Sequence, residues 1–180
     1  KEICSIPFDI RLQVNALAAN PMDGLLYFQS MDGLYKIDAS CKVSKVCSLG
    51  MWSVSGGFDH LGRYWTTGGG SGSDTGFVYA IDVNNCDTLK GPIPTDYMLD
   101  IVFNMFDCSL YYMGTIAGLS GTASLMRMDT LGNVDPALRW WVVPKTRAYG
   151  GIAVGNDGII YMIGGDDPGL NGKLAVMDTR

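Results

Sequence analysis

The sequence predicts an all-β fold made of four copies of one antiparallel unit. Three observations lead to this prediction. Short runs of β-branched and aromatic residues alternate with turns rich in Gly, Asp and Asn, two short motifs recur in a fixed order, and no segment has the length and period of a helix. The chain has 180 residues, 47% of them hydrophobic, and contains 24 glycines. It is long enough to bury one substantial core, and its glycines suit many tight turns.

The first motif is a strand that ends in an apolar residue followed by Asp. Successive copies end 44, 47 and 49 residues apart, at Asp38, Asp82, Asp129 and Asp178. A residue that serves a site is expected in one copy only, whereas a residue that recurs in every copy serves the scaffold. We therefore expect each Asp to fix the turn that follows it through hydrogen bonds to the backbone.

The second motif is a turn followed by an aromatic strand, and one copy precedes each copy of the first motif. The copies occupy residues 23–27, 61–65, 107–111 and 157–161. Together the two motifs define a four-stranded antiparallel meander of 44–49 residues, which is the size of one β-propeller blade. In a single domain of residues 1–180, the predicted blades span about residues 14–49, 53–94, 99–143 and 149–180.

The first residues of the chain indicate how the blades form a ring. Residues 3–6 (ICSI) are similar to residues 46–49 (VCSL) in the last strand of the first blade, whereas the last blade stops after its third strand. The sequence therefore predicts a four-bladed β-propeller in which residues 1–7 complete the last blade and remove a free sheet edge. Four consecutive blades of a larger propeller are the alternative.

The last unit resembles a kelch repeat. It has the aromatic pair Trp140 and Trp141, then Arg147, then residues 160–165 (IYMIGG) and a strand ending in Asp178. The second unit keeps a variant of the glycine pair, and the first and third units lack it, so an NHL-like or an uncharacterised secreted propeller stays open. The resemblance implies a propeller that serves mainly as a binding platform. It does not extend to kelch-type copper radical oxidases, which need two histidines, because the chain has one His.

The order of the strands separates the connections into two faces. The connections from second to third strands, and those between blades, lie on one face and include the long glycine-rich segments; we call this the long-loop face. The other connections are short and form the turn-rich face. Aromatic, Arg and Asp side chains on exposed loops suit contact with a protein or a glycan. The predicted binding residues are Trp52, Asp74, Tyr97, Arg147, Tyr149, Asp166 and Asp167.

One long loop is rich in oxygen ligands. Asp166, Asp167 and Asn171 follow one another closely, and together with backbone carbonyls they are candidate ligands for Ca²⁺. The loop has no EF-hand pattern, and Asp in a glycine-rich turn commonly serves as a turn former, so the prediction is no cofactor or a calcium ion.

Candidate catalytic residues are few. His60 is the only histidine, its turn is expected to be exposed, and no nucleophile-elbow motif is present. Asp100 and Asn104 bracket the first strand of the third blade, and Asn15 opens that of the first. These residues could form the site of a lactonase-like, metal-dependent hydrolase at the mouth of the central channel. The sequence nevertheless favours a binding module over an enzyme.

The five cysteines permit at most two disulfides and one free thiol. The expected pairs are Cys41–Cys47, across one hairpin, and Cys86–Cys108, between neighbouring blades, with free buried thiols as the alternative. Disulfides would indicate an extracellular protein.

Charge and hydropathy restrict the partners. The net charge is −5, without a run of Lys or Arg, which argues against nucleic acid and anionic membranes. No apolar run is long enough for membrane insertion. The sequence therefore predicts a secreted or cell-surface module that binds a protein or a glycan through its long-loop face. A purely structural repeat that self-associates or joins a larger surface assembly is a further alternative.

Overall fold

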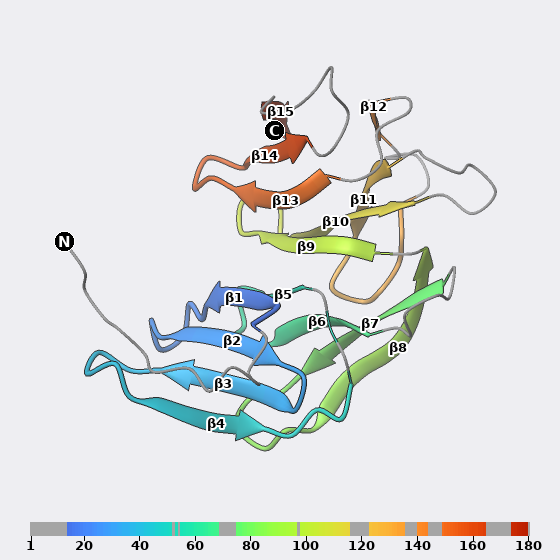
Figure 1. Ribbon diagram of the computed structural model, residues 1–180. Coiled ribbons are helices and arrows are strands. Elements are labelled where there is room, and N and C mark those ends of the chain that lie inside the picture. Colours follow the sequence, from blue (N-terminus) through green and yellow to red (C-terminus); the bar gives the residue numbers. More distant parts are fainter. Residues whose placement is uncertain are drawn as a thin grey trace.

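The computed structural model describes residues 14–51, 53, 55–68, 75–96, 98–115, 123–135, 140–143, 149–164 and 174–179. Within these ranges the chain is all β, with fifteen strands in four antiparallel sheets. In each sheet, strands that are consecutive in the sequence pair with each other. The first strands of the sheets lie nearest the centre of the molecule, and the sheets extend outward from them (Figure 1).

The strand bounds are as follows. The first sheet comprises β1 (Ala16–Ala19), β2 (Leu26–Ser30), β3 (Gly33–Ile37) and β4 (Val43–Cys47). The second comprises β5 (Gly56–Phe58), β6 (Tyr64–Gly68), β7 (Thr75–Ile81) and β8 (Thr88–Asp96). The third comprises β9 (Met98–Asn104), β10 (Ser109–Thr115), β11 (Ala123–Met128) and β12 (Trp140–Val143). In the fourth, β13 (Tyr149–Val154), β14 (Ile159–Gly164) and β15 (Leu174–Asp178) are described. Residues 1–7, the predicted closing strand, lie outside the described residues.

The turns form as their sequences predict. Asp38 Oδ1 accepts hydrogen bonds from the backbone N–H groups of Ser40 (2.9 Å) and Lys42 (3.0 Å). Asp82 and Asp129 make the corresponding bonds, to the N–H groups two residues further on, at 2.9 and 2.8 Å. The prediction that the recurrent Asp fixes the following turn is therefore confirmed for these three copies.

These turns make stability depend on pH in the acid range. Hydrogen bonds from Ser40 and from the backbone of Lys42 lower the pKa of Asp38. For Asp129, desolvation acts to raise the pKa, but hydrogen bonds from Asn133 and the turn backbone lower it on balance. Because the folded pKa lies below the unfolded value of about 3.9, the stabilisation is complete above that pH and is lost as the pH falls through the folded pKa.

We therefore expect the urea concentration at the unfolding midpoint to stay constant between about pH 7 and pH 5. It should decrease when the pH is lowered below about 4, because proton binding is linked to unfolding. The double variant Asp38→Asn/Asp129→Asn keeps an acceptor at each turn but cannot titrate there. Its urea midpoint should fall less between about pH 4 and pH 2 than that of the wild type. Identical pH profiles would show that the turn carboxylates do not contribute.

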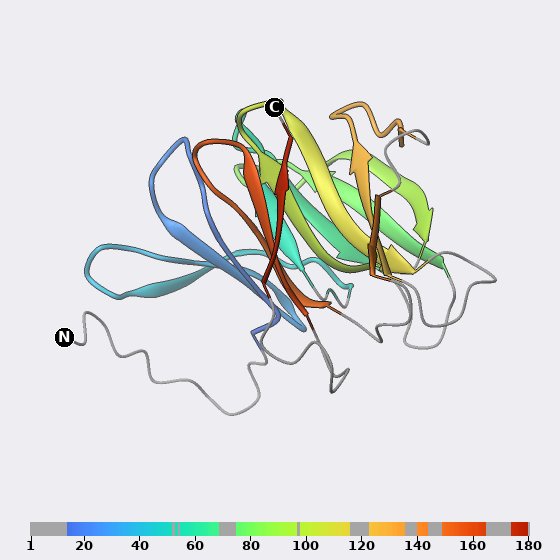
Figure 2. The ribbon, with the colours of Figure 1, turned by 90° about the horizontal axis from the view of Figure 1, so that it is seen from above.

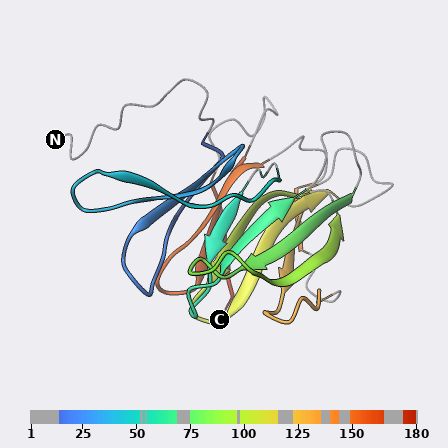
Figure 3. The same cartoon turned by 90° about the horizontal axis from the view of Figure 1, so that it is seen from below.

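Three apolar clusters lie between sheets that follow one another in the sequence. Tyr27, Leu34 and Tyr64 belong to the cluster between the first and second sheets. The cluster between the second and third sheets includes Trp65 and Tyr112, and that between the third and fourth comprises Tyr111, Met113, Leu125, Ile160 and Met162. Successive sheets thus pack face to face through these clusters, and the same sheets are seen from above in Figure 2 and from below in Figure 3.

The disulfide pattern differs from the prediction. Cys47, at the end of β4, is bonded to Cys86, in the connection between β7 and β8, with their Cα atoms 5.6 Å apart. The predicted Cys41–Cys47 pair is wrong because extended β4 separates the two residues by about 20 Å along the chain, beyond the reach of a disulfide. Cys41 is disulfide-bonded to another partner. The predicted Cys86–Cys108 pair is also wrong, since Cys108 is a free, exposed thiol.

Candidate functional site in the central cavity

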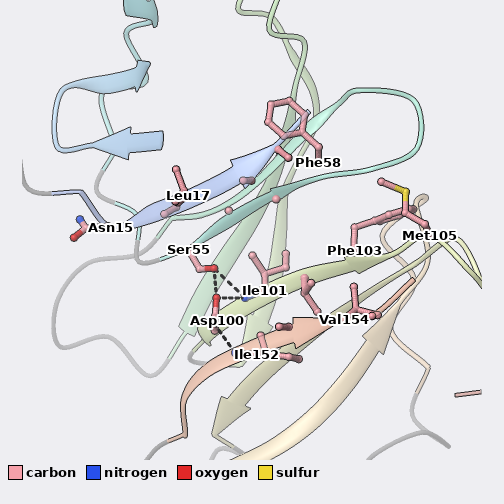
Figure 4. Close-up of a pocket in the computed structure, with 18 of the residues that line it drawn as sticks. Asn15, Leu17, Ser55, Phe58, Asp100, Ile101, Phe103, Met105, Ile152 and Val154 are labelled. Carbon is pink, nitrogen blue, oxygen red and sulfur yellow. Dashed lines mark hydrogen bonds between the residues drawn. The ribbon is translucent and has the colours of Figure 1, made fainter. Parts of the chain in front are cut away.

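The four innermost strands surround a central cavity. β1 contacts β5, β5 contacts β9, and β9 contacts β13. The cavity has a volume of about 550 Å³ and is lined by residues of these four strands and their ends (Figure 4). Its lining is polar and apolar in similar measure, and Ile101, Phe103, Ile152 and Val154 are among its apolar members.

The inner strands that line this cavity contain several small residues. β1 reads Ala-Leu-Ala-Ala, and β5 begins with Gly56 and Gly57. A Cβ at Gly56 would collide with the hydroxyl of Tyr64 in the neighbouring strand β6. The glycine is therefore required where β5 packs against β6.

Polar groups gather at one end of the cavity, around the carboxylate of Asp100. Its Oδ1 accepts a short hydrogen bond from the Ser55 hydroxyl and one from the N–H of Ile101 (2.9 Å). Its Oδ2 accepts from the N–H of Ile152 (2.9 Å; Figure 4). The Asp100 side chain thus joins β9 of the third sheet to β13 of the fourth sheet. It also joins both strands to Ser55, which directly precedes β5 of the second sheet. Three of its roughly four acceptor positions are occupied by the protein's own donors.

A buried polar network lies behind Ser55, between the first and second sheets. Gln29 Oε1 is 2.6 Å from the Thr66 hydroxyl and 3.3 Å from that of Tyr64. The Thr66 hydroxyl is also 2.8 Å from that of Ser53, which donates to the carbonyl of Ser55 (2.8 Å). Burial raises the pKa of Tyr64 well above its usual value, so its hydroxyl stays protonated and is available to donate.

Within the part of the chain that the structure describes, two buried amide nitrogens in this region have no hydrogen-bond partner. They are Nδ2 of Asn15, which lines the cavity, and Nε2 of Gln29. An unpaired buried donor is costly, and such groups commonly mark a place for ordered water or a ligand. Asn15 and Asp100 both contribute to the lining of the cavity, but the Asn15 nitrogen itself is buried.

The polar end of the cavity lies on the long-loop side of the propeller. Antiparallel pairing sets Met98, at the start of β9, beside Gly114, near the end of β10, from which a long connection leaves. At the start of the first sheet, Ala16 pairs with Gln29, next to the connection between β2 and β3. The starts of the inner strands, and with them Asp100, therefore face the side where these connections emerge.

Of the predicted binding residues, the structure describes Tyr149. Trp52, Asp74, Tyr97, Arg147, Asp166 and Asp167, and with them Asn171 of the predicted calcium site, lie outside the described residues. Tyr149 is the first residue of β13, and its backbone pairs with Gly164. Within the described part of the chain, no three His, Cys, Asp or Glu side chains lie close enough to hold a metal ion.

The other candidate residues are separated by the fold. Asn104 lies at the opposite end of β9 from Asp100, where it donates to Thr179 (2.9 Å) and accepts from the N–H of Phe106 (2.9 Å). His60 is exposed as expected, and its ring stacks on Phe103 at 5.6 Å between centroids. Asp59 beside it is fully buried, so the expectation that this whole turn is exposed was wrong.

Sequence reasoning missed Ser55 as the partner of Asp100. The two residues are 45 positions apart in different blades. The only available signal was that both lie near the start of the first strand of a repeat, where neighbouring blades come together at the centre.

Comparisons with known proteins identify the fold class. No protein-family model matches the chain, and no curated protein matches it either. Solved structures do match, and three of them are described here. One is from a nidogen/laminin complex (TM-score 0.66, 11% identity, 93% of this chain and 65% of the other). A second is TolB from Acinetobacter baumannii (TM-score 0.65, 15% identity, 93% of this chain and 41% of the other). The third is a gluconolactonase from Xanthomonas campestris (TM-score 0.63, 15% identity, 92% of this chain and 58% of the other).

These structures are β-propellers, and the chain described here has the fold of a β-propeller. At identities this low the likeness concerns the fold alone, and the chain spans 41–65% of the three structures. The comparisons support the propeller class but not the kelch family in particular. No helix in the described part of the chain is long and apolar enough to cross a membrane.

Proposed function

We propose that this protein is an extracellular binding module that recognises a protein or a glycan through its long-loop face. The observation that carries the proposal is the central cavity of about 550 Å³, because its polar end lies on the side where the long connections leave the sheets. A cavity of this size is in the range of small-ligand sites, and its lining combines polar and apolar surface in similar measure. It suits a sugar unit or a side chain inserted from a partner.

The chemistry of Asp100 favours binding over hydrolysis. A carboxylate that ligates a metal or moves a proton needs free acceptor positions, whereas Asp100 accepts from Ser55, Ile101 and Ile152. The exposed apolar side chain of Leu17, in contrast, lines the cavity and is available for contact with a ligand. Among the structural neighbours, nidogen comes from a complex with laminin, which supports a protein-binding role.

An extracellular location agrees with the Cys47–Cys86 bond, because stable disulfides persist mainly in oxidising compartments. The alternative is a structural protein whose copies associate with one another in a larger surface assembly. Such contacts would also use exposed loops of the propeller.

A screen against glycans and extracellular-matrix proteins tests the proposal. We expect saturable binding to one of these classes. If the predicted calcium loop takes part, the affinity will differ between Ca²⁺ and a chelator; if it does not, the two affinities will be equal. The variant Leu17→Ser removes an exposed apolar side chain from the lining of the cavity and should weaken the complex about tenfold. Leu89→Ser, on exposed outer strand β8, is the matched control and should bind as the wild type does.

A lactonase-like hydrolase is the second candidate, and the gluconolactonases among the structural neighbours favour it. Asp100 and Asn15 in the cavity are its candidate polar residues. Turnover of a lactone or ester panel that disappears with a chelator, and again with Asp100→Asn, would select this candidate over a binding module.

A further inference from the structure

A patch of exposed apolar side chains lies on the turn-rich face, on the side away from the polar end of the cavity. We call it the turn patch; it consists of Met22 (68% exposed), Leu61 (58%), Met105 (46%) and Phe106 (58%). They come from the connections between β1 and β2, β5 and β6, and β9 and β10. Single exposed apolar residues are ordinary, but apolar residues gathered from several turns indicate an interaction surface.

The turn patch crosses from blade to blade. Met22 lies against Gly62, where an added Cβ would come within 2.5 Å of Met22 Cγ. Phe106 lies against Gly158 of the fourth blade, where a Cβ would come within 3.0 Å of its side chain. Both glycines have positive φ, 75° and 81°, so each turn needs glycine and leaves space for the apolar neighbour.

The described connections of the same face carry half of the 18 acidic residues of the protein. The described connections on this side contain two basic residues, Lys42 and Arg63, and nine aspartates. The aspartates are Asp23, Asp38, Asp59, Asp82, Asp87, Asp107, Asp129, Asp135 and Asp157. Nine carboxylates less two cations give a formal charge of −7, which exceeds the −5 of the whole chain. Aspartates that are scattered in the sequence are therefore concentrated on one face by the fold.

Turn formation does not by itself require this charge. Asn20 Oδ1 accepts from the N–H of Met22 (3.0 Å) and Asn104 Oδ1 from that of Phe106 (2.9 Å). In the second blade Asp59 makes the same bond, to the N–H of Leu61 (2.9 Å). A neutral amide thus makes the same turn bond as a carboxylate, and the aspartates other than the buried Asp59 add negative charge to the face that carries the turn patch.

We propose that the turn-rich face is a second interaction surface, distinct from the long-loop face, and that it binds a basic segment of a partner protein that also carries apolar side chains. The carboxylates attract the basic residues of the partner and fix its orientation, and Met22, Leu61 and Phe106 contact its apolar side chains. An interface of this kind combines apolar and charged contacts, and the described turns carry both kinds of side chain.

The proposal is tested with a fluorescein-labelled lysine–leucine peptide, whose binding is followed by fluorescence anisotropy. We expect saturable binding that weakens about tenfold between low and high salt, because exposed charges are screened. The variant Met22→Ser/Leu61→Ser/Phe106→Ser should weaken binding about tenfold by removing the apolar contacts. Asp87→Asn/Asp157→Asn should weaken it mainly at low salt.

Matched controls lie elsewhere on the molecule. Leu174→Ser changes an equally exposed residue of β15, and Asp32→Asn changes a carboxylate in the connection between β2 and β3, on the long-loop face. Both should bind the peptide as the wild type does. The proposal is overturned if the peptide does not bind, if the controls weaken binding as much as the turn-patch variants, or if the apolar triple variant binds unchanged, which would mean charge attraction alone.

Discussion

Removing the Cys47–Cys86 bond is expected to lower the free energy of unfolding by about 4 kcal/mol. The bond joins residues 39 positions apart and ties the outer strand of the first blade to a turn of the second. In the chain-entropy model, a cross-link across a loop of that length stabilises the fold by about 4 kcal/mol. Alanine is the suitable replacement, because Cys47 is buried in an apolar cluster where a serine hydroxyl would lack a partner.

Urea unfolding followed by tryptophan fluorescence measures this effect without reductant, which would also reduce the second disulfide at Cys41. Cys108→Ala is the control: its thiol is free and exposed, so the free energy of unfolding should change by less than about 0.5 kcal/mol. If Cys47→Ala/Cys86→Ala unfolds within about 1 kcal/mol of the wild type, the bond does not stabilise the contact between the two blades.

Asp59→Ala is expected to lower the free energy of unfolding by about 3–5 kcal/mol. The carboxylate is fully buried, and its Oδ2 accepts from Arg63 Nε (2.6 Å) and Trp65 Nε1 (2.8 Å). Its Oδ1 accepts from the backbone N–H groups of Leu61 and Arg63. The substitution leaves a largely buried guanidinium and a buried indole N–H without their acceptor, and both losses destabilise the folded state.

Asp157→Ala is the matched control for this prediction. Asp157 occupies a turn at the same end of its blade, but it is exposed and bonds one backbone N–H, that of Ile159 at 3.2 Å. Its loss should cost about 1 kcal/mol or less. Equal effects of the two substitutions, measured by urea unfolding, would contradict the role assigned to the buried carboxylate.

The features that sequence reasoning predicted correctly are local ones. A strand ending in Asp forms its turn through bonds to residues two and four positions further on, as at Asp38, so the repeat can be read directly from the sequence. The all-β class and the division into antiparallel sheets follow from the same local patterns.

What sequence reasoning missed depends on contacts between blades. Cys47 pairs with a turn of the next blade, and Asp100 pairs with Ser55 across two neighbouring strands. Asp59 lies in a polar turn sequence, yet the side chains of Arg63 and Trp65 enclose it. The concentration of carboxylates on one face arises from the ring of turns, which no linear pattern displays.

Substitution of the predicted contact aromatics tests the central proposal most directly. Binding of the protein or glycan found in the screen would be measured by calorimetry for the wild type, for Trp52→Ala/Tyr97→Ala/Tyr149→Ala, and for Met22→Ser/Leu61→Ser/Phe106→Ser on the other face. We expect the aromatic variant to fold normally and to lose at least about a hundredfold in affinity, the effect of removing several contact residues, while the turn-patch variant binds as the wild type does. Unchanged affinity of a correctly folded aromatic variant would contradict recognition through the long-loop face.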